Sequence, residues 1–265
     1  MLWLGVAYLG ALAALFITAL WTANGFTGNI ERTWTLDNFR ELFSQEVYRT
    51  ITIRTLLTAV GVTVIDAVIA FPVALYMAKV ASPRAQRLLV IAILTPLWAS
   101  YLVKAYAWRG MFSSSGPIDW LLSPFGLSSP GYGLFATVVT LSYLWLPYMV
   151  LPVYAGFERI PASYLEASSD LGARAGTTFR RVVLPLVFPA LVAGSIFTFS
   201  LTLGDYITPT LVGGAGSTFI GNIVYSTGLG VSGNLPFAAA FAAVPLVVMG
   251  IYLALAKRTG AFEAL

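Results

Sequence analysis

Six apolar stretches, each about 20 residues long, constrain the fold of this chain more than any other feature. An α-helix needs about 20 consecutive apolar residues to cross the hydrocarbon core of a bilayer. Hydrophobic residues make up 58% of the chain and charged residues only 10%, so we expect an all-α, multi-pass membrane protein and not a soluble globule. The six expected transmembrane helices are residues 2–21, 55–78, 88–108, 134–157, 186–203 and 237–256.

The basic residues between these stretches fall on alternate connections. Lysines and arginines gather at residues 79–87, 158–181 and 257–258, and connections rich in these residues face the cytoplasm. The pattern therefore places both termini in the cytoplasm and the remaining connections outside. It also accounts for the net charge of +4 without a nucleic-acid partner. Residues 1–265 show no internal repeat, so we expect a single transmembrane domain.

Residues 160–185 form the longest polar and charged stretch in the second half of the chain. Ser163 and Glu166 have the spacing of a capping box, which predicts a helix that begins just after Ser163. Gly172 can end this helix in a left-handed turn, and residues 179–183 can form a second short helix. The apolar positions of the first helix recur at three- and four-residue spacings: Tyr164, Leu165, Ala167, Leu171 and Ala175. We interpret the stretch as a docking surface for a partner, and an ordinary solvated loop is the alternative.

The same stretch resembles the EAA loop found in the membrane subunits of binding-protein-dependent ABC importers. The order Glu166-Ala167-Ser168, Gly172, Val182 and Leu184-Pro185 keeps every spacing of that motif. It departs from the motif at Ser168, which replaces an alanine, and at Val182, which replaces an isoleucine. In that family the loop occupies a groove of the ATP-hydrolysing subunit and passes its motion to the membrane helices. The ATPase-coupling residues that the resemblance implies are Tyr164, Leu165, Glu166, Ala167, Ser168, Asp170, Leu171, Gly172 and Ala173.

A second segment, residues 203–214, has the sequence LGDYITPTLVGG. It resembles the segment that follows the EAA loop in the first permease of spermidine/putrescine-type importers. The likeness extends to residues 36–48, 220–222 and 234–240. It implies the fold of a type I ABC importer permease (MetI-like), with a peripheral helix near residues 2–21 and a five-helix core within residues 55–256. It also implies a small cationic organic substrate such as the polyamines spermidine and putrescine. Relatives with this layout carry opines, aminophosphonates or ferric ion, and these substrates remain alternatives.

The resemblance further implies an assembly in the inner (plasma) membrane of a bacterial cell. The expected partners are a second homologous permease, a dimer of ATP-binding cassette ATPase subunits, an extracytoplasmic substrate-binding protein and the lipid membrane. ATP and Mg²⁺ are then used by the ATPase, so this chain is expected to hold no cofactor and to have no enzyme activity by itself. A secondary transporter is the alternative class, but it is expected to show inverted repeats with interrupted helices, which the sequence lacks.

The composition limits the chemistry that this chain can perform. It contains no histidine and no cysteine, which excludes a His-based triad, a thiol nucleophile and most transition-metal sites. The sequence also has no glycine-rich phosphate loop ending in Gly-Lys-Ser/Thr. We therefore expect neither a catalytic site nor a metal site, and we expect ATP to bind to a separate chain.

Two acidic residues lie within or at the rim of the expected spans. Asp66 is in the middle of the second span, and Asp205 is at the outer end of the fifth. Because a carboxylate in the hydrocarbon layer is costly, it normally faces a cavity or a partner. Each is interpreted either as part of a substrate path or as a structural contact, which for Asp205 is a cap at the end of the span. The connection 204–236 is expected to border the path and to contain a short helix near residues 221–229. Since aromatic faces attract organic cations, the candidate substrate-path residues are Asp205, Tyr206, Asp66, Trp98, Tyr101 and Tyr143.

Overall fold

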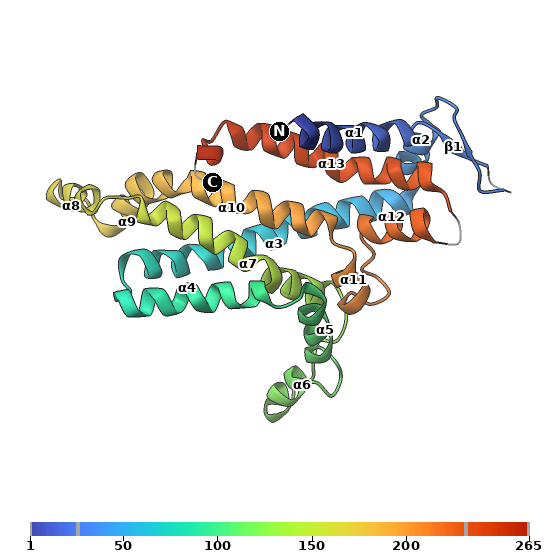
Figure 1. Cartoon of the computed structure of the whole chain (residues 1–265). Helices are drawn as coiled ribbons and strands as arrows, with labels where there is room; N and C mark the ends of the chain where they lie inside the picture. The colour runs from blue at the N-terminus through green and yellow to red at the C-terminus, as the bar shows by residue number, and fades with distance from the viewer. Residues whose placement is uncertain (1, 25–26, 231–232, 264–265) are drawn as a thin grey trace. The chain divides into compact units, whose positions relative to one another are not determined.

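The computed structural model of the chain describes residues 2–24, 27–230 and 233–263 and is almost entirely helical (Figure 1). The helices of ten or more residues are α1 (Leu2–Thr18), α3 (Glu46–Lys79), α4 (Pro83–Trp98), α5 (Tyr101–Met111), α7 (Leu134–Glu158), α10 (Leu184–Gly204), α12 (Ile220–Leu229) and α13 (Leu235–Lys257). The shorter α-helices are α2 (Asp37–Ser44), α6 (Pro117–Leu122), α8 (Ala162–Asp170), α9 (Ala175–Thr178) and α11 (Ile207–Val212). The π-helix η2 (Phe179–Val183) and the 3₁₀ turns η1 (Ser123–Phe125) and η3 (Ala261–Glu263) complete the helical elements. The strands β1 (Thr22–Ala23) and β2 (Ile30–Glu31) pair antiparallel, with Thr22 opposite Glu31.

Four of the described helices are long and apolar enough to cross a membrane. They are α3, α7, α13 and the continuous helix Ala175–Gly204, which joins α9, η2 and α10. The bent pair α4–α5 raises the number to five, whereas α1 is apolar but has only 17 residues. An all-α membrane protein with several apolar spans is therefore confirmed. The predicted spans 55–78, 134–157, 186–203 and 237–256 all lie within these four helices.

The third predicted span, residues 88–108, is not one continuous helix. α4 ends at Trp98, α5 begins at Tyr101, and the two helices are bent by 96°. Ala99, which follows α4, has the extended backbone angles φ −76° and ψ 140°. Pro96 favours the break because it offers no N–H and its ring crowds the carbonyl one turn earlier. The prediction of an unbroken helix is wrong, and the chain turns at residues 99–100.

The chain forms two compact units. The first comprises Met1–Thr58, Met111–Thr137 and Leu203–Gly250, and the second comprises Ala59–Gly110, Val138–Thr202 and Ile251–Leu265. Since the boundaries fall inside α3, α5, α7, α10 and α13, each of these five helices contributes residues to both units.

In the first unit, short elements pack around the beginnings of α3 and α13. Leu42 from α2 and Ile220 from α12 are buried in one apolar cluster with residues of α3 and α13. Asn38 of α2 fastens this helix to the end of α1, because its Nδ2 donates to the carbonyls of Ala19 (2.9 Å) and Trp21 (2.7 Å). The buried clusters thus place α1, α2, α12 and the beginning of α13 together.

In the second unit, α3, α7 and α10 enclose the apolar core. Small residues allow α7 and α10 to approach closely, as is common between membrane helices. A Cβ added to Gly156 of α7 would lie only 2.5 Å from the Cβ of Ala190, and one added to Gly194 of α10 would lie 2.8 Å from the sulfur of Met149. Beyond the ends of α7 and α10 lie α8 and α9 (Figure 1).

Candidate functional site

The predicted docking stretch folds as two short helices, which we call the α8–α9 hairpin (residues 161–178). α8 begins at Ala162, and Pro161 occupies the N-cap position with extended backbone angles and no side-chain hydrogen bond. The predicted start just after Ser163 is therefore wrong, and Ser163 forms no capping box because it already lies in the first turn. Proline is suited to a helix start, since its fixed φ is compatible with the first turn and its missing N–H has no helical partner there.

Gly172 ends α8 in the predicted left-handed turn. Its φ is +74°, a conformation that glycine adopts without the steric cost other residues bear. The Gly172 amide donates to the Ser169 carbonyl (2.9 Å), and the Ala173 amide donates to the Ser168 carbonyl (3.1 Å). The second predicted helix, residues 179–183, is present as the π-helix η2, which runs directly into α10 at Leu184.

Two side-chain interactions hold the hairpin in shape. The hydroxyls of Ser168 on α8 and Thr178 on α9 are hydrogen-bonded at 2.8 Å, and Ser168 is buried. Leu165 packs against the buried core of the second unit. Below the hairpin, Phe179 contacts Phe71 of α3 edge-on, with ring centroids 5.4 Å apart. The hairpin is therefore anchored to the membrane helices through apolar contacts.

The remaining coupling candidates face outwards. Leu171 is 87% exposed and Tyr164 is 52% exposed, although both are large apolar or aromatic side chains. The other exposed candidates are Glu166, Ala167, Asp170 and Gly172, whereas Ala173 is half-buried. A hollow of about 740 Å³ lies between the hairpin and η2, and Arg174 and Arg181 line it together with several of the predicted residues. Exposed apolar side chains beside arginines form a surface suited to a protein partner.

At the other predicted site, Asp205 lies at the end of α10 and caps α11. Its carboxylate accepts hydrogen bonds from the Ile207 amide (2.9 Å), the Thr208 amide (3.1 Å) and the Thr208 hydroxyl (2.7 Å). The side chain is only 7% exposed. This geometry is that of the structural alternative, a cap that fixes the direction of the chain after α10.

Tyr206, in contrast, presents its ring to a cavity. The ring stacks on Tyr225 of α12, with centroids 4.9 Å apart and an interplanar angle of 14°. Asn222 holds this arrangement, because its Nδ2 donates to the Tyr206 carbonyl (2.8 Å) and to the Thr210 hydroxyl (2.7 Å). Gly221 is required beside it, since an added Cβ would lie 2.9 Å from the Tyr206 Cβ.

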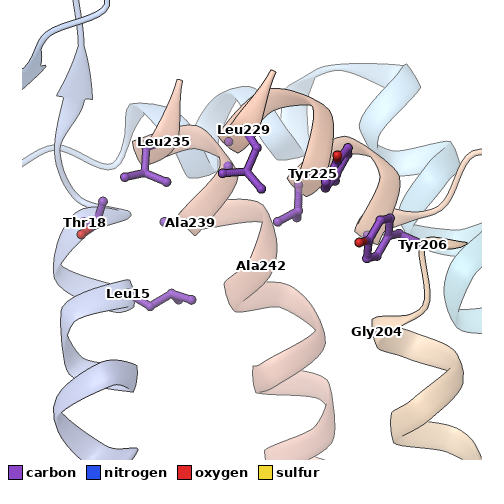
Figure 2. A pocket seen from close by; sticks show the side chains of 13 residues that line it. Leu15, Thr18, Gly204, Tyr206, Tyr225, Leu229, Leu235, Ala239 and Ala242 are labelled. Atoms are coloured by element: carbon purple, nitrogen blue, oxygen red, sulfur yellow. The ribbon is translucent and has the colours of Figure 1, made fainter. Parts of the chain in front are cut away.

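The cavity beside this tyrosine pair measures about 520 Å³ and belongs to the first unit. Figure 2 shows Tyr206 and Tyr225 on one side of it, Leu15 and Thr18 of α1 on the other, and Ala239 between them. Apart from the hydroxyls of Thr18 and the tyrosines, its lining side chains are apolar.

The other substrate-path candidates lie in the second unit. Asp66 is fully buried on α3, and within the described part of the chain neither its two oxygens nor the Ser142 hydroxyl has a hydrogen-bond partner. Tyr101 stacks on Trp145 with centroids 5.7 Å apart. These side chains therefore lie among helices and do not line any of the cavities described above.

Two further aromatic candidates are more exposed. Trp98, the last residue of α4, is 91% exposed. Tyr143 is 39% exposed and lies 5.3 Å from the ring of Trp108. Exposed aromatic side chains of this kind are typical of surfaces that contact lipid or another subunit.

Sequence reasoning did not select Tyr225 or Asn222 as site residues. Both belong to the short helix that was expected near residues 221–229, and the signal that could have found them is the Ile220-Gly221-Asn222 segment. Glycine allows the close approach to Tyr206, and asparagine donates one hydrogen bond to the Tyr206 carbonyl and one to the Thr210 hydroxyl. Among residues 2–24, 27–230 and 233–263, no three His, Cys, Asp or Glu side chains are placed to bind a metal ion.

Together, the apolar spans define a multi-pass, all-α membrane protein. The family model for the inner membrane component of binding-protein-dependent transport systems matches residues 53–260. The chain therefore belongs to this family: it is a multi-pass, non-catalytic permease subunit of an ABC importer in the inner membrane.

Two curated relatives match most of the chain. The chain is 46% identical over 283 residues to the inner membrane ABC transporter permease protein YdcU of Escherichia coli K12, an alignment that covers 100% of this chain and 88% of YdcU. It is 30% identical over 223 residues to the spermidine/putrescine transport system permease protein PotB of Haemophilus influenzae, which covers 83% of this chain and 77% of PotB. The expected resemblance to ABC importer permeases is thereby confirmed.

Solved structures of ABC importers share the fold. A chain of the bacterial alginate ABC transporter, in complex with an alginate pentasaccharide-bound periplasmic protein, superposes with a TM-score of 0.68 and 18% identity, covering 87% of this chain and 84% of that chain. A chain of the inward-facing MetNI methionine ABC transporter superposes with a TM-score of 0.58 and 18% identity, covering 83% and 99%. At this identity the likeness concerns the fold, and it agrees with the expected MetI-like permease.

Proposed function

We propose that this chain lines half of the translocation path of an ATP-driven importer for a small organic cation of the polyamine class. The observation that carries the substrate class is the 30% identity to a spermidine/putrescine permease over 83% of the chain. The stacked Tyr206–Tyr225 pair beside a cavity is consistent with it, because tyrosine faces attract ammonium groups. We take the whole chain as one permease domain with six spans, of which α1 is the peripheral one, and with both termini in the cytoplasm.

The proposed partners are a second, homologous permease, two ATPase subunits and an extracytoplasmic binding protein. The exposed face of the α8–α9 hairpin, with Tyr164, Glu166 and Leu171, docks on an ATPase subunit. ATP binding closes the ATPase dimer and moves the hairpin, and the permease pair then changes from an inward-facing to an outward-facing state by rigid-body motion. The binding protein releases its cargo into the opened path.

Within this proposal, Asp205 acts through its neighbour. Because its carboxylate caps α11, it holds Tyr206 next to Tyr225, and Tyr206 meets the substrate. Replacing Tyr206 with leucine is expected to lower uptake while ATPase binding is retained. The conservative variant Tyr206→Phe keeps the ring face and is expected to retain most of the uptake.

Uptake by the reconstituted importer tests the substrate class. Proteoliposomes that contain both permeases, the ATPase and the binding protein are supplied with radiolabelled spermidine or putrescine, with and without ATP. We expect ATP-dependent accumulation of at least one of the two polyamines. Accumulation of an opine, an aminophosphonate or ferric ion in place of both polyamines would refute the proposed substrate, while retaining the importer.

A further inference from the structure

Lys79, the last residue of α3, reaches the chain just before the α8–α9 hairpin. Its ammonium Nζ donates a hydrogen bond to the carbonyl of Ile160, with an N–O distance of 2.7 Å. Ile160 lies in the short connection between the end of α7 at Glu158 and the start of α8 at Ala162. The contact joins residues that are 81 positions apart in the sequence, so it is a tertiary tie between a membrane helix and the base of the hairpin.

The side chain of Ile160 is buried in a cluster to which the same helix contributes. It is 5% exposed and belongs to the buried cluster that includes Ala74 and Met77, both on the last turns of α3. The carbonyl of Ile160 is thus bonded to α3 by the ammonium of Lys79, and its side chain is buried in the cluster that α3, α7 and α10 share. Hydrogen bonds with a charged donor are about twice as strong as neutral ones, and a cation at the C-terminus of a helix is favoured by the helix dipole.

The residue after Ile160 shows why the hydrogen bond from Lys79 matters for the motion of α8. Pro161 begins α8 as its N-cap, without a side-chain hydrogen bond, and proline has no N–H to tie the connection to a neighbour. The amides of Arg159 and Ile160 bond back to α7, at the carbonyls of Ala155 (3.2 Å) and Phe157 (3.1 Å), so the Lys79 contact is the hydrogen bond that joins this connection to α3. With the contact, a displacement of α8 carries the end of α3 with it.

We propose that Lys79 is a positioning residue that transmits the movement of the α8–α9 hairpin to α3. The proposal rests on the proposed function, in which the hairpin docks on an ATPase. It adds the particular route by which the motion enters the membrane: from Pro161 through the Ile160 carbonyl to the last residue of α3. From there, Phe71 lies two turns further along the same helix and contacts Phe157 of α7 and Phe179 of η2.

Three single variants separate this role from general effects of charge and folding. Lys79→Met removes the ammonium group and keeps a long apolar stem. Lys79→Arg restores a cationic donor. Lys257→Met is the control for loss of a cation at a helix end, because Lys257 is likewise the exposed last residue of a membrane helix, α13, whereas the donor to the Ile160 carbonyl is Lys79.

The first measurement needs the permease alone. The chain has no cysteine, so a pair of spin labels at Val80→Cys, next to the end of α3, and Asp170→Cys, at the end of α8, reports one distance without background. In nanodiscs, the Lys79→Met variant is expected to broaden and shift this distance distribution. Lys79→Arg and Lys257→Met are expected to retain the narrow distribution of the unsubstituted protein.

The second measurement uses the complete importer in proteoliposomes. We expect Lys79→Met to keep ATPase binding and ATP hydrolysis but to lower spermidine uptake per ATP hydrolysed by about tenfold, as the loss of a hydrogen bond from a charged group implies. Lys79→Arg should recover most of this ratio. Uncoupling of hydrolysis from uptake, with rescue by arginine, is a result that a merely structural lysine does not give.

The two measurements distinguish failure of the proposed role of Lys79 from failure of the proposed function. If Lys79→Met leaves both the spin-label distribution and the uptake per ATP unchanged, the positioning role is refuted, whatever the substrate is. If the unsubstituted permease captures no ATPase subunit, the proposed function is refuted, and the spin-label distance still decides whether Lys79 holds the hairpin.

Discussion

Gly172 offers a sharp test of the hairpin's conformation, because alanine adds a single methyl group there without a clash. Its φ is +74°, and a Cβ built at this position has no other atom within 4 Å. The cost of Gly172→Ala is therefore the conformational cost of a left-handed residue, about 1–2 kcal/mol. A change of this size alters an equilibrium by a factor of about 5–30. We expect the end of α8 to open more often by that factor.

Amide hydrogen exchange of the purified permease measures this opening. The Ala173 amide, which is bonded to the Ser168 carbonyl at 3.1 Å, should exchange about 5–30 times faster in the Gly172→Ala variant. Gly176→Ala is the matched control, since Gly176 lies in α9, has an ordinary φ and also has free space around its Cβ. Its exchange should be unchanged or slower, because alanine favours a helix over glycine by about 1 kcal/mol. Equal exchange in the Gly172→Ala variant and the unsubstituted protein would refute the reasoning.

Three further substitutions test the contact between α7 and α10, the hydrogen bonds of Asn222 and the burial of Asp66. Gly156→Ala should lower the melting temperature of the protein in detergent, since its Cβ would lie 2.5 Å from that of Ala190 and overpacking costs about 1–3 kcal/mol; an unchanged melting temperature would show that α7 and α10 cross less closely. Asn222→Ala should destabilise the fold by about 1–3 kcal/mol, because the Phe219 amide loses its acceptor, the Asn222 Oδ1 (2.9 Å); denaturant unfolding measures this, and an effect near zero contradicts it. Asp66→Val should raise the melting temperature, since the two buried carboxyl oxygens have no hydrogen-bond partner among the described residues and an apolar side chain removes that cost; a lower value would mean that the carboxyl group is bonded to a group beyond this chain.

The sequence identifies most helices and the hairpin because both depend on local features. Apolar runs locate the spans, since every backbone group in a membrane must be bonded within its own helix. The end of α8 is equally local: Gly172 adopts the positive φ that its residue type predicts, although the apolar spacing continues to Ala175, which lies in α9. Of the residues that the hairpin motif selects, however, only a part forms its outer surface. Ser168 is buried and bonded to Thr178, so it shapes the hairpin from within.

Two sequence predictions were wrong, the unbroken span 88–108 and the start of α8, and in both cases two local sequence features favour different structures. Hydropathy alone made residues 88–108 one span, although Pro96 weakens the helix one turn before the chain bends by 96°. At the start of α8, the pattern Ser163–Glu166 suggested a capping box, but Pro161 two residues earlier already begins the helix. Apolar patterns do not contain the information that decides between these outcomes, because the choice depends on how neighbouring helices pack.

The site around Asp205 and Tyr206 could be predicted only in part. Asp205 and Tyr206 stand out in the sequence because an acid and an aromatic ring follow an apolar span. Their different roles, a buried cap and a cavity wall, depend on the fold of residues 205–225. The contact of Tyr206 with Tyr225 joins residues 19 positions apart across two short helices, and no periodic pattern predicts it.

Site-specific cross-linking tests the central claim, that the α8–α9 hairpin docks on an ATPase subunit. The chain has no cysteine, so a single Ala167→Cys substitution on the exposed face of α8 gives one reactive thiol, and Ser226→Cys on α12 is the control. In membranes that contain the assembled importer, a short thiol-directed photo-cross-linker at position 167 should join the permease to the ATPase, with a yield that changes when ATP is added. The same reagent at position 226 should give no ATPase product. A cross-link to the ATPase from position 226, or its absence from position 167 in an importer that still transports, would contradict the account.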